Sequence, residues 1–110
     1  MKLVINLPAF NEEDKITETI KQIPSHFDGI DEVFIQVIDD GSRDKTTERA
    51  QTAGANFIHS HKVNRGIGIT FRTSVEKALR NGADIMVNMD ADGQFDPNDI
   101  SKLIQPILDG

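Results

Sequence analysis

The segment EVFIQVIDDGS, residues 32 to 42, is a short, mostly apolar run that stops at two aspartates and a glycine. Its β-branched residues suit a strand that is covered on both faces in a parallel sheet. Runs of the same kind are KLVINL at 2–7, NFIHS at 56–60 and ADIMVNM at 83–89. The sequence therefore predicts four strands of this kind.

Each of these runs is followed by apolar residues at the spacing of an amphipathic helix. They are Ile16, Ile20 and Ile23, a weaker stretch over 45–53, then Phe71, Val75, Ala78 and Leu79, and finally Ile100, Leu103, Ile104, Ile107 and Leu108. The alternation predicts an α/β fold in the order βαβαβαβα, with an open, mainly parallel sheet and helices on both faces. At 110 residues the chain fits a single domain over 1–110.

Helix boundaries are predicted from capping residues. Asn11 is expected to cap the first helix, while Gly54 and Gly82 occupy positions where left-handed C-caps occur. Asp96, followed by Pro97 at the first helical position, predicts the start of the last helix. Pro106 lacks an amide hydrogen and is expected to kink or end that helix near its last turn.

Composition excludes several classes of function. The net charge of −6 disfavours binding to nucleic-acid phosphates, and no basic patch offsets it. With no cysteine there is neither a thiol nucleophile nor a cysteine-based zinc site. The apolar runs are far shorter than the ~20 residues of a membrane span, and no signal peptide is visible. A soluble chain in the cytoplasm is expected.

The ends of the predicted strands carry an unusual amount of negative charge. PAFNEED (8–14), DDGSRD (39–44) and DADGQFD (90–96) follow three of the strands, and HKVNRGIG (61–68) follows the remaining one. In an open parallel sheet, ligands bind outside the carboxyl ends of the strands. The carboxylates expected on this rim are Glu12, Asp39, Asp40, Asp90 and Asp92. Their repulsion favours a divalent cation with oxygen ligands, which would in turn hold a diphosphate.

Each motif taken alone also has a simpler interpretation. DDGS and DADG are typical turn sequences, and NEED resembles the acids that stabilise a helix amino terminus. The pair Gly66 and Gly68 is consistent with a flexible loop. His59 and His61 lack a third ligand nearby in the sequence, so we expect surface histidines rather than a zinc site. The coincidence of the acidic turns at one edge favours a metal and nucleotide site.

Familiar phosphate-binding motifs do not match the spacing. A dinucleotide fingerprint requires G-x-G-x-x-G after the first strand, and no P-loop consensus is present. An EF-hand loop starting at Asp90 would need glycine and glutamate where Phe95 and Ser101 stand. The D-x-D-G of haloacid-dehalogenase phosphatases, with Asp90 as nucleophile and Asp92 as acid, remains a minor alternative.

Four blocks in order resemble glycosyltransferase family 2, which has the GT-A fold. They are NLPAFNEED, VIDDGSRDKTTERA, VNRGIG and NMDADGQFDPNDISKLI, and together they span essentially the whole chain. The similarity is greatest to the dolichol-phosphate and polyprenyl-phosphate sugar transferase branch. It implies that residues 1–110 are the amino-terminal, nucleotide-sugar-binding part of such an enzyme, truncated at the carboxyl terminus.

The resemblance also implies roles for particular residues. The implied nucleotide-binding set is Pro8, Ala9, Glu12, Asp39, Asp40, Asp90, Ala91 and Asp92, and the implied ligands of Mg2+ or Mn2+ are Asp90, Asp92 and Gln94. Pro8, Ala9 and Glu12 would line the base and ribose. Asp40, with Asp39, would hydrogen-bond the base. The resemblance assigns no catalytic base, and Phe10 stands where the family often has tyrosine.

The activity implied by the resemblance is metal-dependent, inverting transfer of a sugar from a nucleoside diphosphate. Expected partners are a nucleoside-diphosphate sugar and a sugar or lipid-phosphate acceptor such as a polyprenyl phosphate, without nucleic acid. Membrane contact is expected only through a lipid acceptor or segments beyond residue 110, which would place the protein peripherally at the cytoplasmic membrane face. The alternative is a non-catalytic nucleotide- and metal-binding fragment or accessory module.

Overall fold

The computed structural model describes residues 1–93, 96 and 98–110, and within them four strands form one parallel sheet in the order β3-β2-β1-β4. The strands are β1 (Lys2–Ala9), β2 (Glu32–Asp39), β3 (Phe57–Ser60) and β4 (Ile85–Asn88), and the helices are α1 (Ile16–Gln22), α2 (Thr46–Ala53), α3 (Ile67–Arg80) and α4 (Asn98–Leu108). The predicted βα alternation, the parallel sheet and the α/β class are confirmed.

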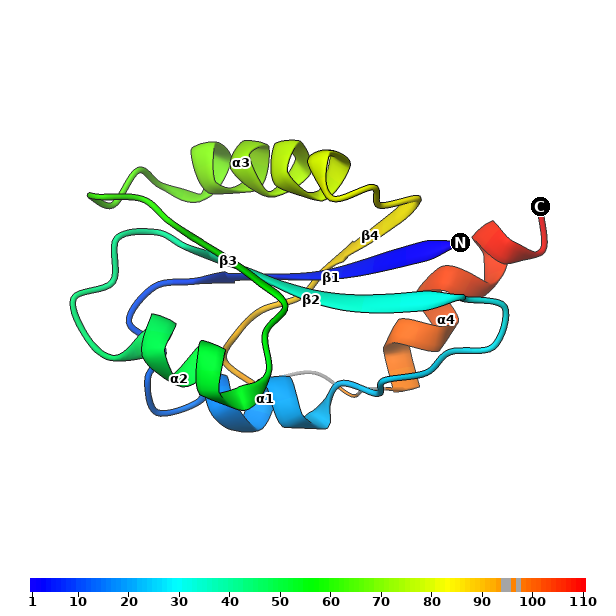
Figure 1. Cartoon of the computed structure of the whole chain (residues 1–110), viewed down its shortest axis with the longest axis horizontal. Helices are drawn as coiled ribbons and strands as arrows, with labels where there is room; N and C mark the ends of the chain where they lie inside the picture. The colour runs from blue at the N-terminus through cyan, green and yellow to red at the C-terminus, as the bar shows by residue number, and fades with distance from the viewer. Residues whose placement is uncertain (94–95, 97) are drawn as a thin grey trace.

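The helices form layers on both faces of the sheet. Figure 1 shows α3 on one face and α1, α2 and α4 on the other. On β1, Leu3, Ile5 and Leu7 are fully buried in the apolar core beneath α1 and α4. Burying one such side chain contributes roughly 1.5–3 kcal/mol, so this row anchors the central strand. The exposed surface of α3 is mixed, because it carries Arg72, Glu76 and Arg80 as well as the apolar Ile67, Phe71 and Leu79.

The carboxyl ends of the strands meet at the edge opposite the two chain termini (Figure 1). Ala9 of β1 pairs with Asp39 of β2, and the next amide, that of Asp40, donates to the Ala9 carbonyl at 2.8 Å. On the other side of β1, the Met89 amide donates to the Asn6 carbonyl at 2.9 Å. The parallel register therefore brings the acidic strand exits to one edge, as predicted.

The carboxyl-terminal helix caps agree with the sequence. Gly54 ends α2 in the left-handed region with φ of 110°, and Gly82, with φ of 80°, follows the last residues of α3. At α4, the Asp96 carboxylate accepts the Asn98 amide at 2.9 Å, whereas Pro97 lies outside the described residues. Pro106 sits in the last turn of α4, which ends at Leu108. Among the described residues no helix has the length and apolarity to span a bilayer.

The prediction that Asn11 caps the first helix is wrong. Helix α1 begins later, at Ile16, after a turn in which the Glu12 carbonyl accepts the amides of Lys15 and Ile16. Asn11 instead adopts a positive φ of 53° and its side-chain oxygen accepts the Arg43 amide at 3.0 Å. Its side chain is used to bind the turn after β2, a long-range contact that local capping rules do not contain.

Candidate functional site

A cavity of about 500 Å³ opens at the carboxyl edge of the sheet. It is lined by Pro8, Ala9, Phe10, Asp40, Ile67, Gly68, Thr70, Phe71, Asn88 and Asp90. These residues come from the ends of β1, β2 and β4 and from the first turns of α3. The expected cleft shared by the tips of the first, second and fourth strands is therefore present.

The sequence-predicted residues divide into two groups around this cavity. Pro8, Ala9, Asp40 and Asp90 line it. Glu12, Asp39, Ala91 and Asp92 lie outside its lining, and Gln94 lies outside the described residues. The lining set thus contains residues from each strand exit that carries an acidic motif.

The two aspartates of DDGS have different surroundings. The Asp39 carboxylate accepts the Ser42 amide at 3.2 Å, which is the local bond expected of a simple turn. The Asp40 carboxylate instead accepts the backbone amides of Arg65 and Gly66, each at 2.9 Å. Asp40 therefore holds the loop that follows β3 against the end of β2.

The Asp40 carboxyl is stabilised in its ionised form. Burial by itself raises the pKa of this carboxyl, but hydrogen bonds from His61 and from the amides of Arg65 and Gly66 outweigh burial and hold the pKa below its usual value. An anionic carboxylate thus forms part of one wall of the cavity.

The expectation that His61 is a surface residue is wrong. Its side chain is 6% exposed, its Nδ1 lies 2.8 Å from Asp40 Oδ1, and its Nε2 lies 3.0 Å from Thr73 Oγ1. His59 is half-buried beside it, with the rings edge to face and their centroids 5.7 Å apart. Burial and desolvation lower the pKa of His59, with Lys77 and His61 adding to the effect. Within the part of the chain that the structure describes, His59 and His61 belong to no group of three or more His, Cys, Asp or Glu side chains that could hold a metal ion.

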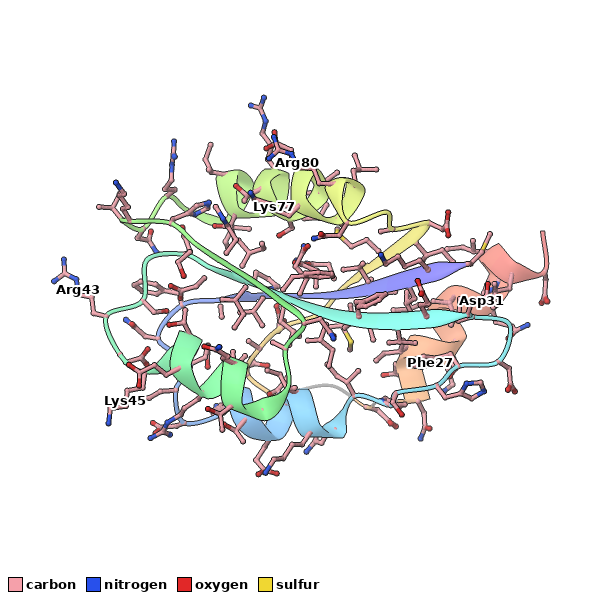
Figure 2. All side chains as sticks on the ribbon, viewed as in Figure 1. Phe27, Asp31, Arg43, Lys45, Lys77 and Arg80 are labelled. Atoms are coloured by element: carbon pink, nitrogen blue, oxygen red, sulfur yellow. The ribbon has the colours of Figure 1, made fainter. Side chains whose placement is uncertain are left out.

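The loops after β1 and β2 are joined by reciprocal hydrogen bonds. The donors and acceptors are Asn11 N to Ser42 Oγ, Arg43 N to Asn11 Oδ1, Glu12 N to Thr46 Oγ1, Glu13 N to Asp44 Oδ2 and Lys45 N to Glu13 Oε2, at 2.8–3.2 Å. These bonds fix the two acidic motifs relative to each other. The basic side chains of the second loop, Arg43 and Lys45, extend outward into solvent in Figure 2.

Glu12, Asp90 and Asp92 are close enough to repel one another. Burial raises the pKa of the Glu12 carboxyl above its usual value, and the charges of Asp92 and, more weakly, Asp90 raise it further. No three acidic or imidazole groups among the described residues converge as a ready-made metal cage. The exposed Asp90 and partly exposed Asp92 nevertheless fit Mg2+ chemistry, since this ion commonly takes one or two carboxylates and completes its shell with substrate phosphates and water.

Some lining residues were not predicted from the sequence. Ile67, Gly68, Thr70 and Phe71 belong to the segment after the paired glycines, whose bulky residues gave no reason to assign a ligand contact. Asn88 was read only as part of a strand. The available signal was an amide in an otherwise apolar strand one residue before MDADG.

Fold, cavity and acidic edge together define an α/β protein with a ligand site at the carboxyl ends of its strands. The profile described as Glycosyl transferase family 2 matches residues 4–110. The chain belongs to this family.

Relatives support the assignment over nearly the whole chain. An uncharacterised protein of Methanocaldococcus jannaschii is 38% identical over 107 residues, covering 97% of this chain and 42% of that protein. The UDP-N-acetylglucosamine–dolichyl-phosphate N-acetylglucosaminyltransferase of Methanococcus voltae is 36% identical, and the match covers 93% of this chain and 45% of that protein. The present chain spans less than half the length of these relatives.

Among solved structures, glucosyl-3-phosphoglycerate synthase from Mycobacterium tuberculosis, in complex with Mn2+, uridine diphosphate and glucosyl-3-phosphoglycerate, superposes with a TM-score of 0.80. The identity is 31%, and the match covers 99% of this chain and 40% of that one. The same enzyme has also been crystallised with Mg2+ and uridine diphosphate.

Proposed function

We propose that this chain binds a nucleoside-diphosphate sugar and a divalent cation for inverting transfer of the sugar to an acceptor. The observation that carries the proposal is the cavity of about 500 Å³ bounded by both Asp40 and Asp90 in a chain of glycosyltransferase family 2. A cavity of this size, with apolar walls and a few polar groups, is typical of small-ligand sites.

The nucleoside is proposed to enter between the end of β1 and the start of α3. Pro8 and Ala9 supply small apolar walls, and the rings of Phe10 and Phe71, each about half exposed, offer faces for a base. Phe10 thereby retains the aromatic surface of the tyrosine that is common in the family. Asp40 supports this wall by holding the loop 61–66 and presents its carboxylate edge to the base.

The diphosphate is proposed to lie toward Asp90 and Asp92, which would hold Mg2+ or Mn2+, with Gln94 as the further ligand implied by the family pattern. A bound cation would act as a Lewis acid that stabilises the charge developing on the departing diphosphate. Without it, Glu12, Asp90 and Asp92 would repel the diphosphate, which explains why this chain would bind the metal and nucleotide together.

In the proposed reaction, an acceptor oxygen forms a bond to the anomeric carbon from the face opposite the nucleotide. The bond from that carbon to the diphosphate breaks, and its electron pair leaves with the nucleoside diphosphate. A hydroxyl acceptor would lose its proton to a base. A polyprenyl-phosphate acceptor, the class named for the Methanococcus voltae relative, is already an anion and would need none.

Isothermal titration calorimetry of the chain with a panel of nucleoside-diphosphate sugars, with and without Mn2+, tests the binding part of this proposal. We expect one sugar nucleotide to bind with Mn2+ and to bind much more weakly without it. The absence of binding across the panel would contradict the proposal.

Product analysis tests the transfer step. The chain is incubated with the tightest-binding sugar nucleotide and a polyprenyl phosphate, and the anomeric configuration of any product is read by nuclear magnetic resonance. Inversion is expected, and retention would contradict the mechanism. Binding without turnover would favour the accessory-module alternative.

A further inference from the structure

A row of amides crosses the sheet: Asn6 and Gln36 are buried, and Asn88 is exposed at the end of β4. Gln36 of β2, Asn6 of β1 and Asn88 of β4 occupy matched positions in the parallel register. Gln36 Nε2 donates to Asn6 Oδ1 at 2.9 Å, and Asn6 Nδ2 donates to Asn88 Oδ1 at 2.7 Å. The row lies beneath α3, whose Ser74 contacts both Asn6 and Gln36.

This row is costly for a sheet interior. Asn6 and Gln36 are 0% and 1% exposed, and their neighbours along the two strands are mainly valine, isoleucine and leucine. Within the described chain, no donor reaches Gln36 Oε1, and an unsatisfied buried acceptor costs about 1–3 kcal/mol. Such a departure from an apolar pattern is expected where a residue serves function rather than stability.

The hydrogen bonds fix which way each amide faces. The Ser74 carbonyl can only accept, so the Gln36 group 3.0 Å from it must be the NH2. The Ser74 hydroxyl donates to the Thr70 carbonyl at 2.8 Å, so the Asn6 group 2.9 Å from that hydroxyl must also be an NH2. Both constraints turn Asn6 Nδ2 toward Asn88 and require Asn88 to face it with its oxygen.

The fixed orientation of the Asn88 amide determines which of its groups is available in the cavity. With its oxygen committed to Asn6, Asn88 has its NH2 turned away from the row, and Asn88 lines the same cavity as Asp40 and Asp90. No residue in the described chain accepts a hydrogen bond from this NH2. It is a pre-oriented neutral donor in a cavity whose lining also includes the carboxylates of Asp40 and Asp90.

We propose that Asn88 is a specificity-determining residue whose side-chain NH2 donates to an acceptor oxygen of a bound nucleoside diphosphate, and that Asn6 and Gln36 are positioning residues for it. This inference rests on the proposed function. Asn6 and Gln36 are too deeply buried to touch a ligand, so they act only by holding the orientation of Asn88.

Calorimetry with adenosine, cytidine, guanosine and uridine diphosphates and with pyrophosphate, each with Mn2+, tests the proposal. Asn88→Ala should weaken the tightest nucleoside diphosphate about threefold to tenfold, as expected for loss of one neutral hydrogen bond. The matched control is Asn81→Ala. Asn81 caps the carboxyl end of α3, whereas the cavity lies at its amino end, so this variant should leave the affinity unchanged. If Asn88→Ala weakens pyrophosphate binding by the same factor, the acceptor oxygen lies on the diphosphate. If the variant weakens nucleoside-diphosphate binding but leaves pyrophosphate binding unchanged, the acceptor oxygen lies on the nucleoside.

The double variant Asn6→Leu/Gln36→Leu separates positioning from stability. We expect it to melt at the parent temperature or higher, because both partners of a buried polar pair are replaced by apolar groups. It should still bind nucleotide more weakly, and adding Asn88→Ala should then cause little further loss. Circular dichroism confirms that each variant is folded.

The outcomes separate the two proposals. If the parent binds a nucleoside diphosphate and Asn88→Ala binds it equally well, the role of Asn88 is overturned while the proposed function stands. Fully additive losses in the combined variant would overturn the positioning role of Asn6 and Gln36. A parent that binds no nucleoside diphosphate would overturn the proposed function and this inference together.

Discussion

At the residue scale, Asp40 shows how a single carboxylate links two loops. One of its oxygens faces His61 and the Arg65 amide, and the other faces the Gly66 amide. In Asp40→Asn, an NH2 replaces one oxygen and opposes an N–H donor whichever way it is turned. We expect a loss of about 1.5–3 kcal/mol in unfolding free energy, the range for hydrogen bonds to a charged group, measured by urea denaturation.

The pH dependence of that loss follows from the lowered pKa of Asp40. Its stabilising contribution is present above the unfolded value of 3.8 and is lost as the pH falls through the lower folded value. The parent and Asp40→Asn should therefore converge in stability below about pH 4. A constant gap down to low pH would show that the charge of Asp40 is not responsible. The variant should also bind nucleoside diphosphate more weakly without metal.

Ionisation of Glu12 changes the stability of the folded chain in the opposite direction to ionisation of Asp40. Because burial and Asp92 raise its pKa above the usual 4.5, ionised Glu12 destabilises the folded chain, and the penalty appears as the pH rises through the folded pKa. Glu12→Gln should raise the melting temperature at pH 7 by a few degrees and change it little near pH 3.5. Glu32→Gln, exposed at the other end of the sheet, is the control. A decrease at pH 7 would contradict the repulsion.

At the element scale, the turn after β2 packs against the loop after β3. Gly41 has φ of 81°, and a Cβ there would lie 2.6 Å from Asn64 N and from the Val63 carbonyl carbon. Gly54 also has a positive φ, of 110°, but nothing lies within 4 Å of its Cβ position. Glycine in DDGS is thus required for close approach of two backbones as well as for the turn.

The two glycines provide a matched comparison. Gly54→Ala should cost roughly 1–2 kcal/mol, the strain of a left-handed alanine, whereas Gly41→Ala should cost clearly more because the loop 61–66 must move. Urea denaturation of both variants gives the difference. Equal losses would mean that the loop adapts without cost and that the contact at Gly41 does not hold the cavity wall.

Elements were predicted from the sequence to different degrees. Strands and helices followed from periodicity, because burial on both faces of a parallel sheet imposes continuous apolar runs such as 32–38. The start of α1 did not follow, because Asn11 bonds a loop about thirty residues away. His61 and Asn88 were missed for the same reason. Their partners, Asp40 and Asn6, become neighbours only through the sheet.

At the scale of the whole molecule, the parallel register turns motifs that are separate in sequence into one site. Acidic exits had to meet once the strands ran in parallel, so the edge carrying the cavity was predictable. The cavity itself was not, because its walls depend on how α3 sits over β1 and β2. The division between Asp39, in a local turn, and Asp40, across two loops, likewise needed the tertiary structure.

The last prediction concerns coupling between that edge and global stability. If Asp90 and Asp92 hold a cation together with a diphosphate, ligand binding stabilises only the folded chain. At a hundredfold excess over the dissociation constant, Mn2+ with uridine diphosphate should add about 2.7 kcal/mol, which raises the melting temperature by roughly 10 °C. Either component alone should add much less, and a chelator should reverse the gain.

Asp90→Asn distinguishes a metal site from an acidic turn. Asp90 is exposed, so the variant should melt without ligand within a few degrees of the parent, yet lose most of the gain from Mn2+ and uridine diphosphate. Asp28→Asn makes the same change in net charge in the exposed loop before β2, at the far end of the sheet, and should keep the gain. If DADG served only as a turn, the parent would show no ligand-linked gain and Asp90→Asn would differ from it only in unliganded stability. An equal gain in the parent and both variants would instead place the cation elsewhere, because the lost carboxylate would then have had no part in holding it.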